Sequence, residues 1–152
     1  MNEKISLEQK IENMKKTTEF LLSLDESFTL PNGWKTKELL LHLWSWDDEF
    51  VRICQNKMKN DLDQCKFEFQ SMEMDYSEWN DYMLDKMKDY DFKKAQKKFK
   101  ETRYKILEIF DELIKLPETI EDEKSYLRTE RILDLWQHDK MHLEAGGAKI
   151  DF

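Results

Sequence analysis

The stretch TKELLLHLWSWDDEFVRICQNKMK, residues 36–59, contains neither glycine nor proline and repeats an apolar pattern along its whole length. Large apolar side chains recur every three or four residues, at Leu39, Leu43, Trp46, Phe50 and Ile53. An α-helix has 3.6 residues per turn, so this spacing gathers them on one face. The stretch therefore predicts a long helix with a buried side, which must pack against other helices.

Two further stretches predict long helices. Residues 6–24 begin with Ser6 followed three residues later by Gln9, the pattern of a capping box, and continue with apolar residues at helical spacing. Residues 91–116 carry a similar apolar face and stop before Pro117. A polar stretch with scattered aromatic residues, residues 60–75, and then a short helix that Ser77 could cap separate this helix from the stretch 36–59.

A last helix is expected from Ser125 or Thr129 to Ala145, where Gly146 and Gly147 end it. The whole chain has only three glycines and two prolines, which leaves little turn chemistry for many short strands. We therefore expect an all-α protein. Its residues 1–152 would form a single four-helix-bundle domain, with an elaborated connection between the second and third helices.

The amino-acid composition of the chain limits which kinds of partner we expect. Of its residues, 39% are hydrophobic and 38% are charged, which is typical of a soluble globular domain. No apolar run is long enough to span a membrane. A net charge of −8 repels phosphate backbones, so we expect no nucleic-acid partner. No secretory signal is visible at the N-terminus, so a cytoplasmic location with Cys54 and Cys65 reduced is expected.

The chain has three histidines, and their placement suggests a metal site. His138 and His142 are four residues apart in the last predicted helix, which places their Cβ atoms about 6 Å apart on one face. His42, in the second predicted helix, could complete a three-nitrogen site that leaves a coordination position free, as catalytic metal sites do. Two plainer interpretations stay open: His42 as a hydrogen-bonded core residue, and the pair as surface residues near a helix C-terminus.

Other side chains could serve such a site. Glu49 lies seven residues after His42 and therefore on the same stripe, which makes it a candidate catalytic base or fourth ligand, or else a solvated carboxylate. Trp46 lies one turn after His42 and should wall the pocket. Asp47 and Asp48 point elsewhere on this helix and are expected at the surface.

Two candidates precede His138 in the last predicted helix. Asp134, four residues earlier, could accept a hydrogen bond from an imidazole and so orient it. Arg131, seven residues earlier, could meet an anionic group of a substrate, or form an ion pair with a neighbouring acid. Zinc or nickel suits imidazole ligands best, and manganese and iron remain open.

Two segments resemble motifs of the DinB/YfiT-like family. The first is Gly33-Trp34 followed by KELLLHL at residues 37–43, where a tryptophan precedes a histidine by eight residues. The second is WQHDKMHL at residues 136–143, which is similar to the His-x-x-x-His motif of the family's last helix. One position departs from the pattern: Lys35 stands where the family often has Ser or Thr as N-cap, so that Thr36 could cap the helix one residue later.

The resemblance implies an up-down-down-up four-helix bundle in which His42, His138 and His142 bind a divalent metal. It also implies thiol-dependent transferase or isomerase chemistry, a low-molecular-weight thiol as a second cofactor, and a homodimer. Trp34 matches the family's tryptophan at the mouth of the second helix.

Three hypotheses about function follow. The first is a metal-dependent enzyme, a hydrolase or a thiol S-transferase, that activates water or a low-molecular-weight thiol against a small electrophilic substrate. The second is a non-catalytic bundle that sequesters a small molecule or toxin, with incidental histidines. The third is a structural protein that pairs through an apolar helix face.

Overall fold

The computed structural model describes residues 4–152, and these residues are helical apart from loops and one isolated bridge between Thr29 and Lys35. Four helices form the bundle and are called the long helices below: α1 (Leu7–Ser23), α2 (Thr36–Met58), α5 (Phe92–Leu113) and α7 (Leu135–Ala145). The other elements are the 3₁₀-helix η1 (Leu62–Gln64), α3 (Glu68–Ser71), α6 (Thr129–Ile132) and α4 (Tyr76–Lys86), which has 11 residues like α7. The prediction of an all-α fold is confirmed for the part of the chain that the structure describes.

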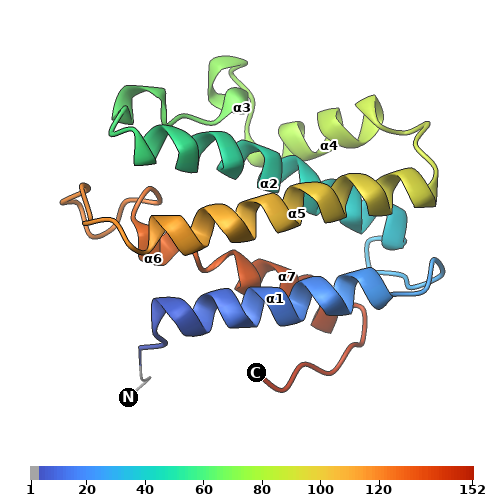
Figure 1. The fold of residues 1–152 in the computed structure, drawn as a ribbon. Coiled ribbons are helices and arrows are strands. Elements are labelled where there is room, and N and C mark those ends of the chain that lie inside the picture. The colour runs from blue at the N-terminus through green and yellow to red at the C-terminus, as the bar shows by residue number, and fades with distance from the viewer. Residues whose placement is uncertain (1–3) are drawn as a thin grey trace.

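The long helices lie side by side as a bundle. Helix α2 packs along α5, while α1 packs against both α5 and α7. Figure 1 shows α1 and α7 running in one direction and α2 and α5 in the other. Since α2 and α5 run the same way, the chain between them must return along the bundle, and η1, α3 and α4 make this crossing over the outer side of α2.

Helices α1 and α5 each begin directly after a residue whose side chain caps the helix N-terminus. Ser6 caps α1 as expected, its hydroxyl oxygen accepting a hydrogen bond from the backbone of Gln9 at 3.1 Å. Asp91 does the same for α5, accepting from Lys94 at 2.7 Å. This helix ends at Leu113, one turn earlier than residues 91–116 predicted.

Helix α2 starts where the apolar pattern placed it. Lys35 is its N-cap residue, and Glu38 reaches back to accept a hydrogen bond from the Lys35 backbone at 3.0 Å. Thr36 is already helical and donates its hydroxyl to the carbonyl of Asp25, so it does not cap the helix. The phase of His42 is therefore the one expected for a helix that begins at Thr36.

The expected last helix is broken in two, which corrects the prediction of one continuous segment. Helix α6 ends at Ile132 and α7 begins at Leu135. Ile132 and Leu133, which lie at the break, are both buried at 1% exposure. Around Asp134 the backbone bonds link residues three apart, from Asp134 to Arg131 and from Gln137 to Asp134, and this tighter winding turns the chain.

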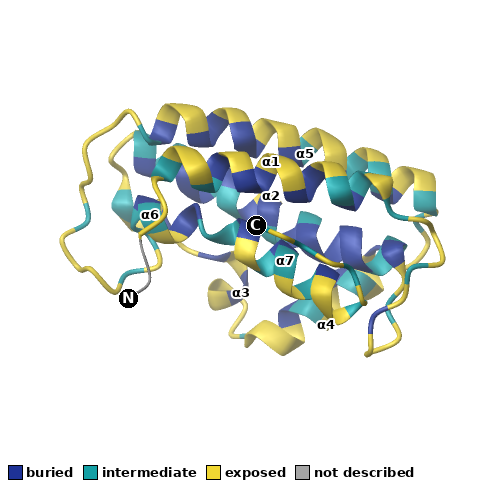
Figure 2. Cartoon of the chain, turned by 90° about the horizontal axis from the view of Figure 1, so that it is seen from below, coloured by how far each residue is buried: buried dark blue, intermediate teal, exposed yellow. Residues whose placement is uncertain are grey.

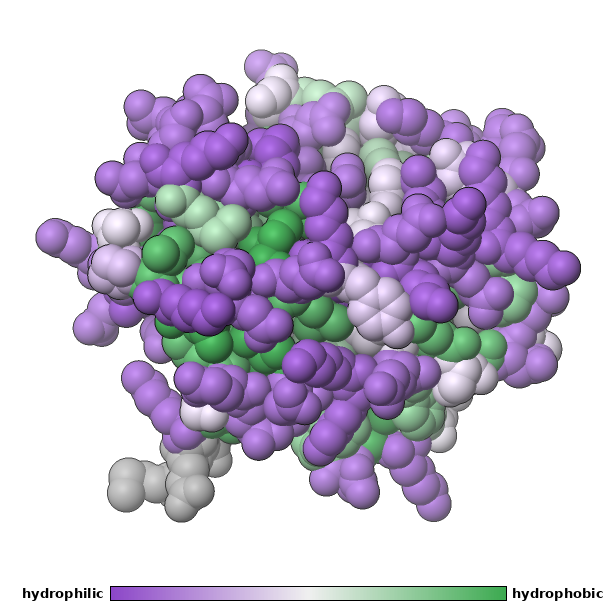
Figure 3. Space-filling view, viewed as in Figure 1, coloured by the Kyte–Doolittle hydropathy of each residue, from purple (hydrophilic) through white to green (hydrophobic). Residues whose placement is uncertain are grey.

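Buried residues face inward from all four long helices, and exposed ones face outward (Figure 2). The face seen in Figure 3 is mostly hydrophilic, with smaller apolar areas between rows of charged side chains. No helix among residues 4–152 combines the length and the apolar character needed to cross a bilayer.

An ionic cluster occupies the centre of the bundle. The Arg103 guanidinium of α5 is 0% exposed and binds Asp47 of α2 at 2.8 and 3.2 Å. It also binds Asp139 of α7 at 2.6 and 3.1 Å. Thr17 and Thr18 of α1 extend the cluster, donating to Asp139 at 2.6 Å and accepting from Arg103 at 3.2 Å. Each long helix thus contributes to one set of hydrogen bonds.

Candidate metal centre

The three histidines meet, although two helices from opposite ends of the sequence carry them. The His42 ring lies 5.3 Å from the ring of His138 and 5.1 Å from that of His142, centre to centre. Within α7, the Nε2 atoms of His138 and His142 are 3.0 Å apart. One ring nitrogen from each residue lies within 4.8 Å of the other two.

These distances fit a metal ion. Zn–N bonds of about 2.0–2.1 Å in a tetrahedral site separate two ligand nitrogens by roughly 3.3 Å. The distances between the histidine nitrogens, 3.0 Å within α7 and at most 4.8 Å overall, lie on either side of that value. Small side-chain rotations would therefore bring all three nitrogens to bonding distance of one ion. His42 is 4% exposed, and neither of its ring nitrogens has a hydrogen-bond partner among the described residues. A buried polar atom without a partner is costly, and a metal bond would supply one.

Burial also keeps the rings in the form that binds metals. Burial, together with the nearby His138 and His142, lowers the pKa of His42 to about 3. Burial likewise lowers the pKa of His138 to about 4, helped by His142 and opposed by Asp139. The pKa of His142 is lowered by burial too. Near neutral pH all three imidazoles are therefore uncharged, with a lone pair free to coordinate.

A pocket of about 390 Å³ opens onto the three rings. The other side chains that line it are two amides, Asn32 and Asn80, and six mainly apolar groups: Trp34, Trp46, Phe50, Tyr76, Leu135 and Met141. The Trp34 ring lies 4.9 Å from the His42 ring and 6.3 Å from the His142 ring. Trp46 is thus in the wall, as its position one turn after His42 predicted.

The structure does not bring Glu49 to the histidines. Its carboxylate is buried, but it accepts hydrogen bonds from Arg52 at 3.1 Å and from the backbone of Glu68, and so ties the start of α3 to α2. Seven residues of helix rise by about 10.5 Å, so Glu49 lies on the same stripe as His42 but two turns further along the helix. Glu49 does not line the pocket.

Asp134 and Arg131 also lie apart from the histidines. Asp134 pairs with Lys10 of α1 at 2.7 Å, and the exposed Arg131 donates to the carbonyl of Glu123 at 3.2 Å. The prediction placed both residues beside His138 by assuming one continuous helix. The break before α7 changes the orientation of Arg131 and Asp134 relative to His138.

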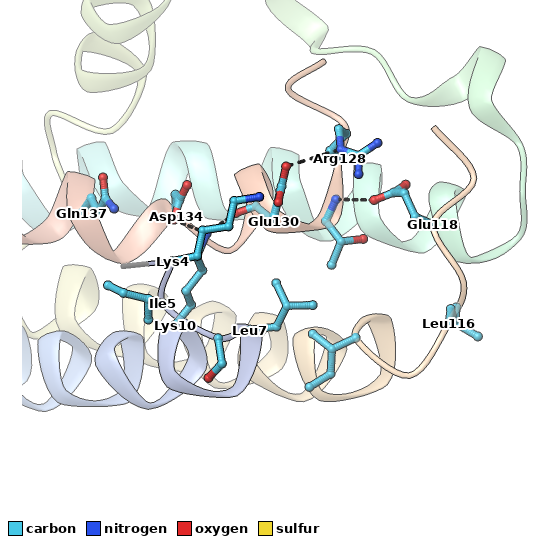
Figure 4. A pocket seen from close by; sticks show the side chains of 13 residues that line it. Lys4, Ile5, Leu7, Lys10, Leu116, Glu118, Arg128, Glu130, Asp134 and Gln137 are labelled. Carbon is cyan, nitrogen blue, oxygen red and sulfur yellow. Dashed lines mark hydrogen bonds and ion pairs between the residues drawn. The ribbon is translucent and has the colours of Figure 1, made fainter. Parts of the chain in front are cut away.

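Asp134 instead lines a larger hollow, of about 1010 Å³, beside α6 and the start of α1 (Figure 4). Its charged groups are largely paired with one another. Lys10 binds Asp134, Arg128 approaches Glu130 at 3.5 Å, and Glu118 accepts from the Thr129 backbone at 2.9 Å. These pairs hold α6 and its preceding loop in place.

Sequence reasoning missed the ionic cluster beneath the site. Asp47 was expected at the surface, and that expectation is wrong, because its side chain is 2% exposed and bound to Arg103. The available signal was Arg103 itself, which stands on the apolar stripe of the third predicted helix between Phe99 and Ile106. A charge at a core position requires buried partners of opposite sign, and Asp139 is the second one.

No protein-family model matches the chain, and neither a curated protein nor a solved structure gives a match. The site therefore has to be interpreted from its own geometry.

Proposed function

We propose that the chain is a metal-dependent enzyme of the DinB/YfiT-like kind, acting on a small electrophilic compound. The observation that carries this proposal is the convergence of His42, His138 and His142, with both nitrogens of His42 unpartnered, beneath a pocket. The opposed directions of the helix pairs α1/α7 and α2/α5 support the up-down-down-up arrangement.

The chain's residues have three tasks in this proposal. His42, His138 and His142 hold the ion, for which zinc or nickel fits best, and leave a coordination position facing the pocket. Trp34 and Trp46 shield that position from bulk water. When bound, the ion supplies a Lewis acid that lowers the pKa of a water molecule or a thiol. The reaction is a hydrolysis if water is the nucleophile and a thiol transfer if a low-molecular-weight thiol is.

Elemental analysis of protein purified without a histidine tag tests the metal centre. We expect about one divalent ion per chain, and loss of that ion in His138→Ala with the helical circular dichroism retained. Gln137→Ala is the matched control, because Gln137 is the exposed neighbour on the same helix. Stoichiometric metal in His138→Ala would refute the assignment. A panel of esters and alkylating agents, with and without added thiols, then separates hydrolysis from thiol transfer.

A second candidate function is sequestration of a small molecule without catalysis. The aromatic pocket wall favours it, since such walls bind apolar ligands by burial alone. It predicts ligand binding that is unchanged by metal removal and no turnover of any compound in the panel. A homodimer, which the enzyme hypothesis shares with related bundles, is tested by light scattering of the same preparations.

A further inference from the structure

The pocket over the histidines has no charged side chain in its wall. Among the residues that line it, none is aspartate, glutamate, lysine or arginine. The nearby charges are used elsewhere: Asp47, Arg103 and Asp139 are bound to one another inside the bundle, and Arg131 is exposed outside the pocket. A charged ligand would therefore lose its hydration and find no opposite charge on the protein.

Besides the three histidines and the Tyr76 hydroxyl, the polar groups of the wall are the amide side chains of Asn80 and Asn32. Asn80 accepts a hydrogen bond at its Oδ1 from the Trp46 indole nitrogen, at 3.0 Å. Asn32 accepts at its Oδ1 from the Trp34 backbone nitrogen, at 2.9 Å. An indole N–H and a backbone N–H can only donate, which fixes each amide with its oxygen toward that donor. The NH₂ group of each amide has no acceptor among the described residues, so both remain available to a ligand.

The rest of the wall suits a flat apolar group. Trp34, Trp46 and Tyr76 present aromatic surface, and the Trp46 ring packs edge-to-face against Phe67 and Phe69, each 5.6 Å away. A volume of about 390 Å³ lies at the lower end of the range of about 300–1,000 Å³ usual for small-molecule sites. The space suits one ring with a short substituent.

The geometry points to an uncharged aromatic compound that carries a hydrogen-bond acceptor, such as a carbonyl oxygen, as the ligand class of this pocket. The NH₂ group of Asn80 or of Asn32 donates to the acceptor, and the ring lies against Trp34 and Trp46. As a statement about substrate, this inference rests on the proposed metal-dependent function, but the binding preference exists without the ion and is measured separately.

Three probes of nearly equal size test the preference: benzamide, which is neutral, benzoate, which is an anion, and benzylamine, which is a cation at pH 7. Each is titrated into the full untagged chain in the presence of a chelator, following the tryptophan indole signals by NMR. We expect benzamide to bind about tenfold more tightly than either ion, since each ion loses its hydration and finds no opposite charge in the wall. Equal or tighter binding of an ion, or no binding of benzamide, overturns the inference.

Asn80→Asp tests the donor. Aspartate keeps the shape and can still accept from Trp46, but it cannot donate and it carries a charge. We expect benzamide affinity to fall about tenfold, the equivalent of one hydrogen bond, and benzylamine to bind more tightly than in the unaltered chain. Asn60→Asp is the control, with the same charge change outside this pocket. Unchanged affinities in a folded Asn80→Asp variant overturn the role of Asn80.

The same samples separate this inference from the metal-dependent function. If zinc does not bind but benzamide is still preferred, the enzyme proposal fails and the ligand class stands. If zinc binds at one per chain and the metal-free pocket shows no preference, the ligand class fails alone.

Discussion

His42 is a candidate metal ligand that destabilises the fold as long as no metal is bound. Its ring is buried with both nitrogens unpartnered, and such a group costs about 1–3 kcal/mol. The leucines and the tryptophan around it would suit an apolar side chain of similar size better. The sequence therefore retains a destabilising residue at this position, which is expected of a site and not of a core.

His42→Leu should consequently act in two opposite directions. Without metal, the free energy of unfolding should rise by about 1 kcal/mol, because an unpaired buried polar group is removed. With zinc added, the unaltered chain should gain in melting temperature and the variant should not. Urea unfolding with a chelator and thermal melts with zinc measure the two effects. A less stable metal-free variant that still responds to zinc would contradict both.

Glu118 gives a prediction about pH. Burial raises its pKa, but hydrogen bonds from Thr129, Lys57 and Ile120 outweigh burial, and the pKa falls from 4.5 to about 2. A carboxyl group with a lowered folded-state pKa stabilises the fold above its unfolded value of 4.5. That stability is lost as the pH falls from about 4.5 to about 2.

Glu118→Gln should therefore lower the free energy of unfolding at pH 7 by about 1 kcal/mol, with the difference shrinking as the pH falls through that window. Urea unfolding at a series of pH values measures it. The control is Glu121→Gln, an exposed residue of the same loop. A deficit that stays constant down to the lowest pH would show that the charge of Glu118 is not what anchors the loop.

At the scale of elements, Arg103 joins the helices at the level of the metal centre. It binds Asp47 of α2 and Asp139 of α7, and Asp139 follows directly on His138. Even with this partner, burial raises the pKa of Asp47 to about 6. Without Arg103, the charged forms of the buried Asp47 and Asp139 side chains would thus be strongly disfavoured. Helix α7 would also lose the hydrogen bonds that fix its rotation about its own axis.

Arg103→Met should lower the free energy of unfolding by about 3–5 kcal/mol, because two buried carboxylates are left without a counter-charge. Lys105→Met, an exposed site on the same helix, should change it little. Since the effect comes from the stranded charges, Asp47→Asn should cost much less in the Arg103→Met background than alone. Additive losses in urea unfolding of the four proteins would contradict this account.

Elements differ in how far sequence predicts them. The positions of α1, α2 and α5 follow from apolar spacing and caps, and the pairing of His138 with His142 follows from helix geometry; all of these are local. The break between α6 and α7 has no such local signal, because no glycine or proline lies between Thr129 and Ala145. Glu49 lies away from the histidines and pairs with Arg52 of the same helix and with the backbone of Glu68, and only the Glu68 contact depends on how the crossing segment folds back.

At the scale of the whole molecule, the candidate ligands come from distant parts of the sequence, since His42 lies 96 residues before His138. His42 belongs to the second helix, while His138 and His142 belong to the last, and the described ion pairs hold α7 chiefly through Asp139 and the Lys10–Asp134 pair at its start. A bound ion would add a link between α2 and the middle of α7, where His138 and His142 lie. It would act as a cross-link that is present only when metal is.

Hydrogen exchange should show this link directly. Adding zinc to metal-free protein should slow amide exchange in α7 and in the first half of α2, because opening either segment now requires loss of the ion. At a zinc concentration 100 times the dissociation constant, the gain is about 2.7 kcal/mol, roughly a hundredfold in the exchange rate of amides that open only with the site. Helix α4 carries none of the ligands and should change little. In His138→Ala zinc should protect nothing, and protection that persists there, or that spreads equally to α4, would mean that the ion binds somewhere other than the three histidines.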